Sequence, residues 1–267
     1  MDSKIINKLL LVLIFIFSTH AKAVEFNGKF IQGHYIIGKT NSGSKIFIDK
    51  KKIKVSKDGY FAFGIEKDRK FDIIITENDN KIIKKIKKRK YNIQKIEGLP
   101  KKKVTPPEEF YARIKRENKL IGKAREIESD LQFFKEKFIT PVDDAIITGV
   151  YGSQRILNGI PKWPHYGLDF AQKKGSPIKA MNNGIVTLAE KDLFYTGATL
   201  IFDHGHGIST LYMHMDKIFV NVGDHVKKGD IIATIGTTGR STGPHLDVRL
   251  NWFGTRLDPA TILNIQE

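Results

Sequence analysis

Short runs of β-branched and aromatic residues, separated by turns, dominate the chain between residues 24 and 98. Residues 24–30 alternate apolar and polar side chains, which is the period of a half-buried strand. Turn-forming groups such as Ser42-Gly43 and Asp58-Gly59 separate the runs that follow. These further runs are residues 45–49, 52–55, 60–63 and 72–76. The pattern predicts a small β-sandwich as an N-terminal accessory domain over residues 24–98.

A helical period replaces the strand period in the next segment, residues 99–140. Thr105-Pro106-Pro107-Glu108 has the sequence of a capping box, with proline in the first turn. Apolar side chains then recur at spacings of three and four and stop before Pro141: Phe110, Ile114, Ile121, Ala124, Leu131, Phe134 and Phe138. The sequence therefore predicts a basic linker and one long connecting helix of about 30 residues, over 108–137, with its apolar stripe packed on a core.

Residues 141–267 return to strands, with frequent glycines and tight turns. Runs typical of strands occupy residues 146–148, 184–188, 199–202, 209–212 and 230–235. Helical periodicity is almost absent before the last residues. We expect an antiparallel all-β domain here and a mainly β protein as a whole.

The first 23 residues have the pattern of a signal peptide. Lys4 and Lys8 precede an apolar run over residues 9–17, which is too short for a membrane span of about 20 residues. Ala21-Lys22-Ala23 fits the small-x-small cleavage pattern. An uncleaved anchor is the alternative. We expect the chain to be exported.

The formal net charge of +16 is unevenly distributed. Residues 81–103 hold eleven basic side chains against Glu97 and carry +10, whereas residues 141–267 hold twelve side chains of each sign. The export pattern and the neutral C-terminal segment together leave nucleic-acid binding little support. The basic segment is typical of a solvated edge strand. Peripheral contact of residues 81–103 with an anionic wall polymer or membrane surface is the alternative.

The chain has no cysteine, so thiol nucleophiles and thiolate ligands are excluded. Histidine and aspartate recur instead at spacings that fit a metal site. His165 and Asp169 lie four residues apart around Gly167, and His245 and Asp247 share one face of a strand. His214 ends a strand between them. A second pair, His204 and His206, lies in a glycine-rich turn that already explains its composition.

Residues 141–267 resemble the lysostaphin-type (LytM-domain) zinc metallopeptidases, which cut peptide bonds in bacterial peptidoglycan. The resemblance rests on an ordered set of motifs, and residues 24–140 resemble more loosely the accessory half of exported Gram-negative members. Residues 222–235 also resemble the hairpin of biotinyl and lipoyl carrier domains, which implies a related β barrel-sandwich shape. The motifs are residues 149–152, 165–169, 175–180, 201–207, 212–214, 222–230 and 239–245.

The resemblance implies that His165 and Asp169 are zinc ligands and that His214 and His245 are catalytic. The family's third ligand is a histidine, and Asp247 stands at that position. Asp247 could bind zinc through oxygen, the site could prefer a harder ion such as Mn²⁺, or the site could be inactive. Because the other four residues are all present, we expect a His165-Asp169-Asp247 zinc site.

The resemblance, together with the export pattern, implies a periplasmic, zinc-dependent metalloendopeptidase that hydrolyses cross-links or stem peptides of peptidoglycan. The alternative is a catalytically inactive LytM-like module that binds and regulates a cell-wall amidase or another envelope protein. The site contains no glutamate of the zincin HExxH type, so histidines must handle the protons.

Overall fold

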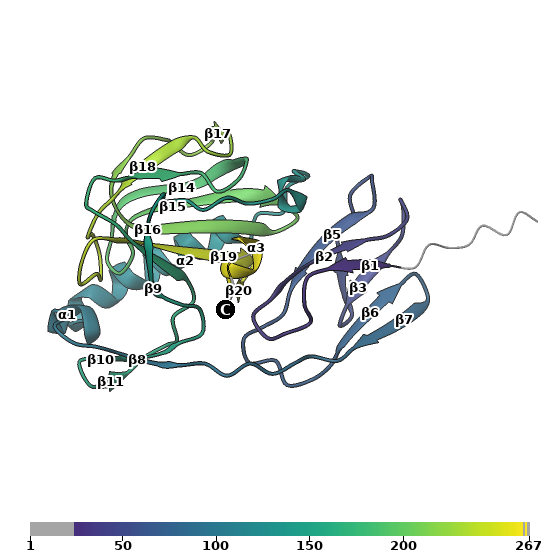
Figure 1. Cartoon of the computed structure of the whole chain (residues 1–267), viewed down its shortest axis with the longest axis horizontal. Coiled ribbons are helices and arrows are strands. Elements are labelled where there is room, and N and C mark those ends of the chain that lie inside the picture. The colour runs from purple at the N-terminus through teal and green to yellow at the C-terminus, as the bar shows by residue number, and fades with distance from the viewer. Residues whose placement is uncertain (1–23, 264, 266–267) are drawn as a thin grey trace, which may run out of the picture.

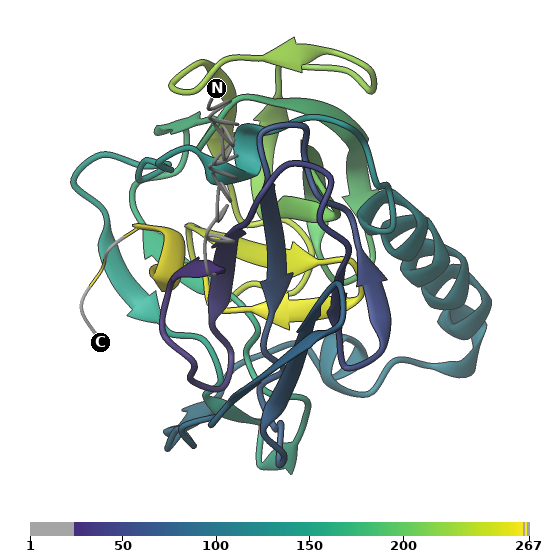
Figure 2. The same ribbon diagram turned by 90° about the vertical axis from the view of Figure 1, so that its right-hand side faces the viewer.

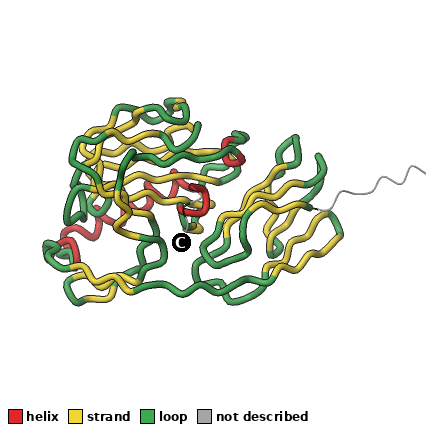
Figure 3. The backbone as a smooth tube through the Cα atoms, in the orientation of Figure 1, coloured by secondary structure: helices red, strands yellow, loops and turns green. Residues whose placement is uncertain are grey.

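The computed structural model describes residues 24–263 and residue 265, so the expected signal peptide over residues 1–23 lies outside the described residues. Two β-rich parts lie side by side, and strands make up most of the regular structure of both (Figures 1 and 3). The mainly β fold class is confirmed. No helix in the described part of the chain has the length and apolar character needed to cross a membrane.

The N-terminal part consists of two antiparallel sheets with the strand orders β1-β2-β5 and β4-β3-β6-β7. Their strands follow the alternation of the sequence: Ile73 and Ile75 of β6 are buried, and Ile74 between them is exposed. Strand β7 lies at a sheet edge and holds the first residues of the basic segment. The strands are β1 (Glu25–Asn27), β2 (Tyr35–Lys39), β3 (Ile46–Ile48), β4 (Lys51–Ile53), β5 (Tyr60–Gly64), β6 (Ile73–Glu77) and β7 (Asn80–Lys84).

The C-terminal part is built on one ten-stranded sheet, in which the main order is β17-β14-β15-β16-β19-β12-β9. Strands β13 and β18 pair with each other, β18 also pairs with β16, and β20 pairs with β19. The strands are β9 (Ile146–Gly149), β12 (Leu168–Ala171), β13 (Pro177–Lys179), β14 (Gly184–Leu193), β15 (Gly197–Gly205), β16 (Ile208–Ile218), β17 (His225–Val226), β18 (Ile231–Ile235), β19 (His245–Trp252) and β20 (Thr255–Leu257). A short helix, α3 (Ala260–Leu263), follows.

A small third sheet ties the connecting segment to the C-terminal part. Strand β8 (Ile93–Ile96) pairs in parallel with β10 (Gln154–Leu157), which also pairs with β11 (Ile160–Pro161). The segment that follows the N-terminal sheets is therefore hydrogen-bonded to the C-terminal part through β8 and β10. The domain limits at residues 98 and 140 stay predictions.

The predicted connecting helix is present, but it ends at Arg125 and not at residue 137. Helix α2 spans Tyr111–Arg125 and is preceded by the 3-10 turn η1 (Glu108–Phe110). Thr105 is the C-cap of a short helix, α1 (Lys101–Val104), and caps nothing downstream, because Pro106 and Pro107 separate it from η1. The apolar period beyond Arg125 continues without the helix, apart from the 3-10 turn η2 (Phe133–Lys135).

Tertiary contacts explain why the helix ends early. The backbone carbonyl of Ser129 accepts hydrogen bonds from the backbone N–H of His206 and from Lys54, and Tyr35 donates its hydroxyl proton to the carbonyl of Phe134. If the helix continued past Arg125, these carbonyls would instead accept the backbone hydrogen bonds of the helix. The non-helical path instead buries Phe134 completely in the core.

One apolar core runs through both parts of the molecule. Strand β5 contacts β19 and β20, and the side chain of Leu257 packs against Gly64, which has no Cβ that would block it. The rotated view shows the N-terminal strands in front of β19 and β20 (Figure 2). The accessory part thus covers one end of the sheet whose strands carry the predicted site.

Candidate metal centre and its cleft

Neighbouring strands bring the two predicted aspartates together. β12 pairs antiparallel with β19, and in this register Asp169 lies directly opposite Asp247. Strand β16 pairs with the other edge of β19 and places Met213 opposite Asp247, so that His214 follows at the same level. Residues far apart in the sequence thus meet because three adjacent strands are in register.

The predicted ligands form one buried cluster. His165 Nε2 lies 3.2 Å from Asp169 Oδ1, and His165 Nδ1 lies 4.0 Å from Asp247 Oδ2. One candidate ligand atom from each of the three residues lies within 4.8 Å of the others. The three residues are at most 5% exposed.

The free polar atoms of this cluster fit a cation. Both ring nitrogens of His165 and Oδ1 of Asp169 are buried without a hydrogen-bond partner among the described residues. Buried polar atoms are rarely left unsatisfied, and one imidazole with two carboxylates is a donor set that zinc accepts. Two tetrahedral zinc ligands lie roughly 3.4 Å apart, which the His165–Asp169 distance matches. Asp247 lies farther out, as expected for a side chain shorter than histidine.

Two arginines, which the sequence analysis did not single out, contact the carboxylates of the cluster. Arg155 Nη2 lies 3.0 Å from Asp169 Oδ2, and Arg249 Nη2 lies 3.2 Å from Asp247 Oδ2. Burial alone would raise both carboxyl pKa values, but His165 and Arg155 hold the pKa of Asp169 well below its usual range. Arg249 and His165 likewise lower the pKa of Asp247. Only Arg249 had a sequence signal, because it follows Asp247 at the i+2 spacing of one strand face.

His214 and His245 lie next to each other beside the cluster, with ring centroids 4.8 Å apart. Nδ1 of His214 donates to the carbonyl of Thr238 at 2.8 Å, and Nδ1 of His245 donates to the carbonyl of Gly243 at 2.9 Å. A carbonyl can only accept, so each neutral ring has an unprotonated Nε2. Burial and the neighbouring His245 lower the pKa of His214 to about 4, which keeps it neutral at pH 7.

Two glycines make room for the carboxylates. A Cβ on Gly149 would lie 2.1 Å from Asp169 Oδ2, and a Cβ on Gly167 would lie 2.0 Å from Asp247 Oδ1. The space beside Gly167 is thus filled by Asp247 from β19. His214 adopts a left-handed backbone, with φ 65°, where the pairing of β15 with β16 shifts register.

His204 lies at the end of β15 and His206 in the turn that follows it, and both have partners of their own. His204 Nδ1 lies 2.7 Å from the carbonyl of Asn183, and Nε2 lies 2.8 Å from Thr210 Oγ1. His206 Nδ1 contacts the carbonyl of Lys54, and its ring packs against Phe134. These contacts agree with a structural turn.

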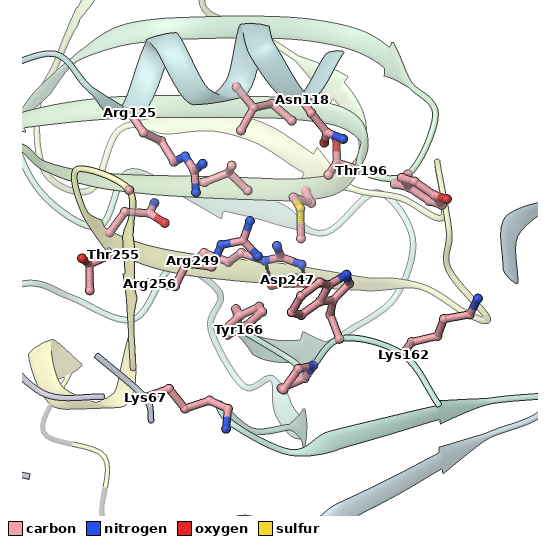
Figure 4. Close-up of a pocket in the computed structure, with 18 of the residues that line it drawn as sticks. Lys67, Asn118, Arg125, Lys162, Tyr166, Thr196, Asp247, Arg249, Thr255 and Arg256 are labelled. Carbon is pink, nitrogen blue, oxygen red and sulfur yellow. Dashed lines mark hydrogen bonds and ion pairs between the residues drawn. The ribbon is translucent and has the colours of Figure 1, made fainter. Parts of the chain in front are cut away.

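The candidate centre opens into a cleft of about 1130 Å³. Figure 4 shows Arg125 reaching into it from α2, Asp247 and Arg249 from β19, and Tyr166 from the segment before β12. His214 lies on its wall, and Trp163, at 81% exposure, stands at its rim.

Fold and site together define a mainly β protein with a candidate metal centre at an open cleft. Residues 163–259 match Peptidase family M23, so the C-terminal part of the chain contains an M23 peptidase domain. The matched range contains every predicted ligand and both predicted catalytic histidines.

Three proteins show what the chain is similar to. Peptidoglycan DD-endopeptidase ShyB of Vibrio cholerae is 45% identical over 83 residues, which is 31% of this chain and 19% of ShyB. The lysostaphin catalytic domain of Staphylococcus simulans is 32% identical, with 46% of this chain and 95% of that chain covered and a TM-score of 0.41. A Pseudomonas aeruginosa protein named as a peptidase M23 is 25% identical, with 88% and 95% covered and a TM-score of 0.67. The chain spans about a fifth of the length of the first curated relatives.

Proposed function

We propose that this protein is an exported, zinc-dependent metalloendopeptidase that hydrolyses peptide bonds in peptidoglycan within the cell envelope. The observation that carries the proposal is the buried His165-Asp169-Asp247 cluster, whose unpaired nitrogen and oxygen atoms face one another beside two histidines. The M23 peptidase domain and the names of relatives such as ShyB support the substrate class.

The side chains divide into two groups by chemistry. His165, Asp169 and Asp247 would hold the zinc ion, which when bound supplies Lewis-acid polarisation of the scissile carbonyl. His214 and His245 present unprotonated Nε2 atoms, which can accept a proton from an attacking water and return it to the leaving amine. Their protonated forms can stabilise the developing oxyanion.

A second candidate function is a non-catalytic module that binds and regulates a cell-wall amidase. The observation in its favour is the pair of arginines, because Arg155 and Arg249 already neutralise Asp169 and Asp247 without a metal. Metal content separates the two candidates.

The first prediction concerns metal binding by Asp247. The purified mature chain should bind one zinc ion, and Asp247→Ala should lower zinc affinity more than about 100-fold, because loss of a ligand exceeds the effect of losing an outer partner. Atomic absorption after dialysis and competition with a chromophoric chelator measure this. Asp192→Ala, which removes an aspartate with an 82% exposed side chain, is the matched control. A folded wild type that takes up neither zinc nor manganese would favour the regulatory module.

The second prediction concerns the flanking histidines. His214→Asn and His245→Gln should slow release of muropeptides from purified peptidoglycan by about 10²–10⁴-fold while zinc stays bound. Asparagine is chosen at 214 because it tolerates the left-handed backbone there. Undiminished muropeptide release by either variant would exclude that histidine from the reaction.

A further inference from the structure

The arginines of the C-terminal part are concentrated in one place. Residues 141–267 contain four arginines, and all four line the cleft beside the candidate metal centre: Arg155, Arg240, Arg249 and Arg256. Helix α2 adds Arg125 from the opposite wall. Of the eight lysines in residues 141–267, only Lys162 lines the cleft. This separation of arginine from lysine favours a role for the planar guanidinium group over a role for charge alone.

The cleft is strongly cationic although the surrounding sequence is neutral. Its lining holds eight basic side chains and only three acidic ones, Glu66, Asp68 and Asp247. Asp68 already pairs with Lys67, and Asp247 pairs with Arg249. This excess is independent of the basic segment at residues 81–103, none of which lines the cleft. A cleft of one sign with low-dielectric walls attracts ligands of the other sign.

Two members of the group lack an acidic partner. No carboxylate of the described residues lies within ion-pair distance of Arg125 or Arg256; Arg256 instead lies over the ring of Tyr166 at 4.7 Å. Nε of Arg125 is buried and has no hydrogen-bond partner among the residues described. Figure 4 shows Arg125 and Arg249 extending from facing elements toward one space, with Arg256 beside them.

These cations lie close enough to affect one another. Burial and the nearby Arg249 lower the pKa of Arg125, and burial together with Arg249 and Arg125 lowers the pKa of Arg256 to about 10. Arg125 and Arg256 stay charged at neutral pH. Mutual repulsion between half-buried cations opposes folding, so the arrangement is better explained by a ligand than by the fold.

The geometry points to a carboxylate-binding subsite, formed by Arg125, Arg249 and Arg256, that takes a free carboxylate of the peptide whose scissile bond lies at the metal centre. Arginine forks bind carboxylates in a bidentate manner. Arg249 joins the subsite to the centre, because it also contacts Asp247. The inference rests on the proposed peptidase function and narrows its substrate to anionic peptides.

Binding of two matched peptides tests the subsite. The probes are synthetic peptidoglycan stem peptides that differ only in having all carboxylates free or all amidated, titrated calorimetrically against the full mature chain carrying His214→Asn to prevent turnover. Amidation should weaken binding by about tenfold or more. Arg125→Gln and Arg256→Gln should remove this difference, whereas Arg116→Gln, on the exposed side of α2, should preserve it. Equal binding of both peptides by the parent chain would overturn the subsite.

Two further measurements separate the alternatives. Arg125→Met should raise the midpoint of thermal unfolding and weaken binding of the free-carboxylate peptide. A lower midpoint would mean that the guanidinium of Arg125 stabilises the fold, and would overturn its assignment to the subsite. Inorganic phosphate should compete only weakly with the free-carboxylate peptide. Phosphate binding as tight as peptide binding would indicate a simple anion site instead. Charge-selective peptide binding by a chain that never cleaves peptidoglycan would uphold the subsite and refute the proposed function.

Discussion

At the scale of single residues, the candidate centre depends on side chains that are absent as well as present. Gly149 and Gly167 lie where any Cβ would collide with the carboxylates of Asp169 and Asp247. Both aspartates are buried and both contact an arginine, so neither has room to turn away. The position of each carboxylate is therefore fixed by packing before any ion binds.

Gly167→Ala tests this requirement. The new Cβ would lie 2.0 Å from Asp247 Oδ1 and 2.7 Å from the carbonyl of Val248, so Asp247 must move. We expect zinc affinity to fall about 10–100-fold and the free energy of unfolding to drop by about 1–3 kcal/mol. Zinc competition and urea unfolding measure the two effects.

Gly122→Ala in α2 is the matched control, because nothing lies within 4 Å of its added Cβ. It should leave zinc binding unchanged and stabilise the helix by about 0.5–1 kcal/mol. If Gly167→Ala bound zinc as tightly as this control, the space beside Asp247 would be irrelevant to the centre.

At the scale of elements, the hairpin of β15 and β16 packs beside the site, because β16 pairs with β19, the strand that carries Asp247. Its turn runs through Gly205, His206 and Gly207, all with positive φ. A Cβ on Gly205 would lie 1.7 Å from the carbonyl of Leu131. His204 holds the turn to Asn183 and Thr210, and burial lowers its pKa to about 4.

This low pKa predicts an acid-sensitive hairpin. The unfolded chain takes up a proton on His204 near pH 6.5, whereas the folded chain takes it up only near pH 4, so stability is complete above pH 6.5 and is lost as the pH falls toward 4. The loss should reach roughly 3 kcal/mol for this residue. Urea unfolding between pH 7.5 and 4.5 measures it.

His204→Asn removes the titrating group. The variant should be less stable than the wild type at pH 7.5 but should lose less stability on acidification. His214, with a pKa of about 4, contributes the same dependence in both proteins. Parallel curves for the two proteins would show that His204 does not control the acid response.

The connecting segment shows how far periodicity alone predicts an element. Phe134 and Phe138 have the spacing of a helical stripe, and both are buried as that stripe required. Their backbone is nevertheless non-helical beyond Arg125, apart from one 3-10 turn, because carbonyls there bond to Lys54, His206 and Tyr35. Apolar spacing predicted burial correctly, and long-range hydrogen bonds decided the conformation.

At the scale of the whole molecule, the two parts are joined by a core and by one enclosed ion pair. Arg89 Nη1 lies 2.6 Å from Asp258 Oδ2, and the side chains are 14% and 1% exposed. Asp258 also accepts the backbone N–H of Ala260, which starts α3. Arg89, a residue of the basic segment, thus serves the interface rather than a surface patch.

Arg89→Met should destabilise the protein because it leaves the carboxylate of Asp258 buried beside an apolar side chain. We expect the free energy of unfolding to fall by about 3–5 kcal/mol. Lys88→Met, at the exposed neighbouring position, should change it by less than about 0.5 kcal/mol. Urea denaturation measures both, and the double variant with Asp258→Asn should recover much of the loss. No recovery would mean that the two side chains act independently.

The sequence by itself determined the strands, the export pattern and the candidate ligands, because these depend on local periodicity and on short motifs. Runs of β-branched and aromatic residues predicted β1, β3, β4, β5 and β6 in the N-terminal part but not β2. The spacing of His165 and Asp169 needed only a short extended segment. Only the tertiary structure decided where Asp247 meets Asp169, where α2 ends, and which arginines face the centre. Those outcomes depend on strand register and on packing between residues far apart in the chain, which no local pattern encodes.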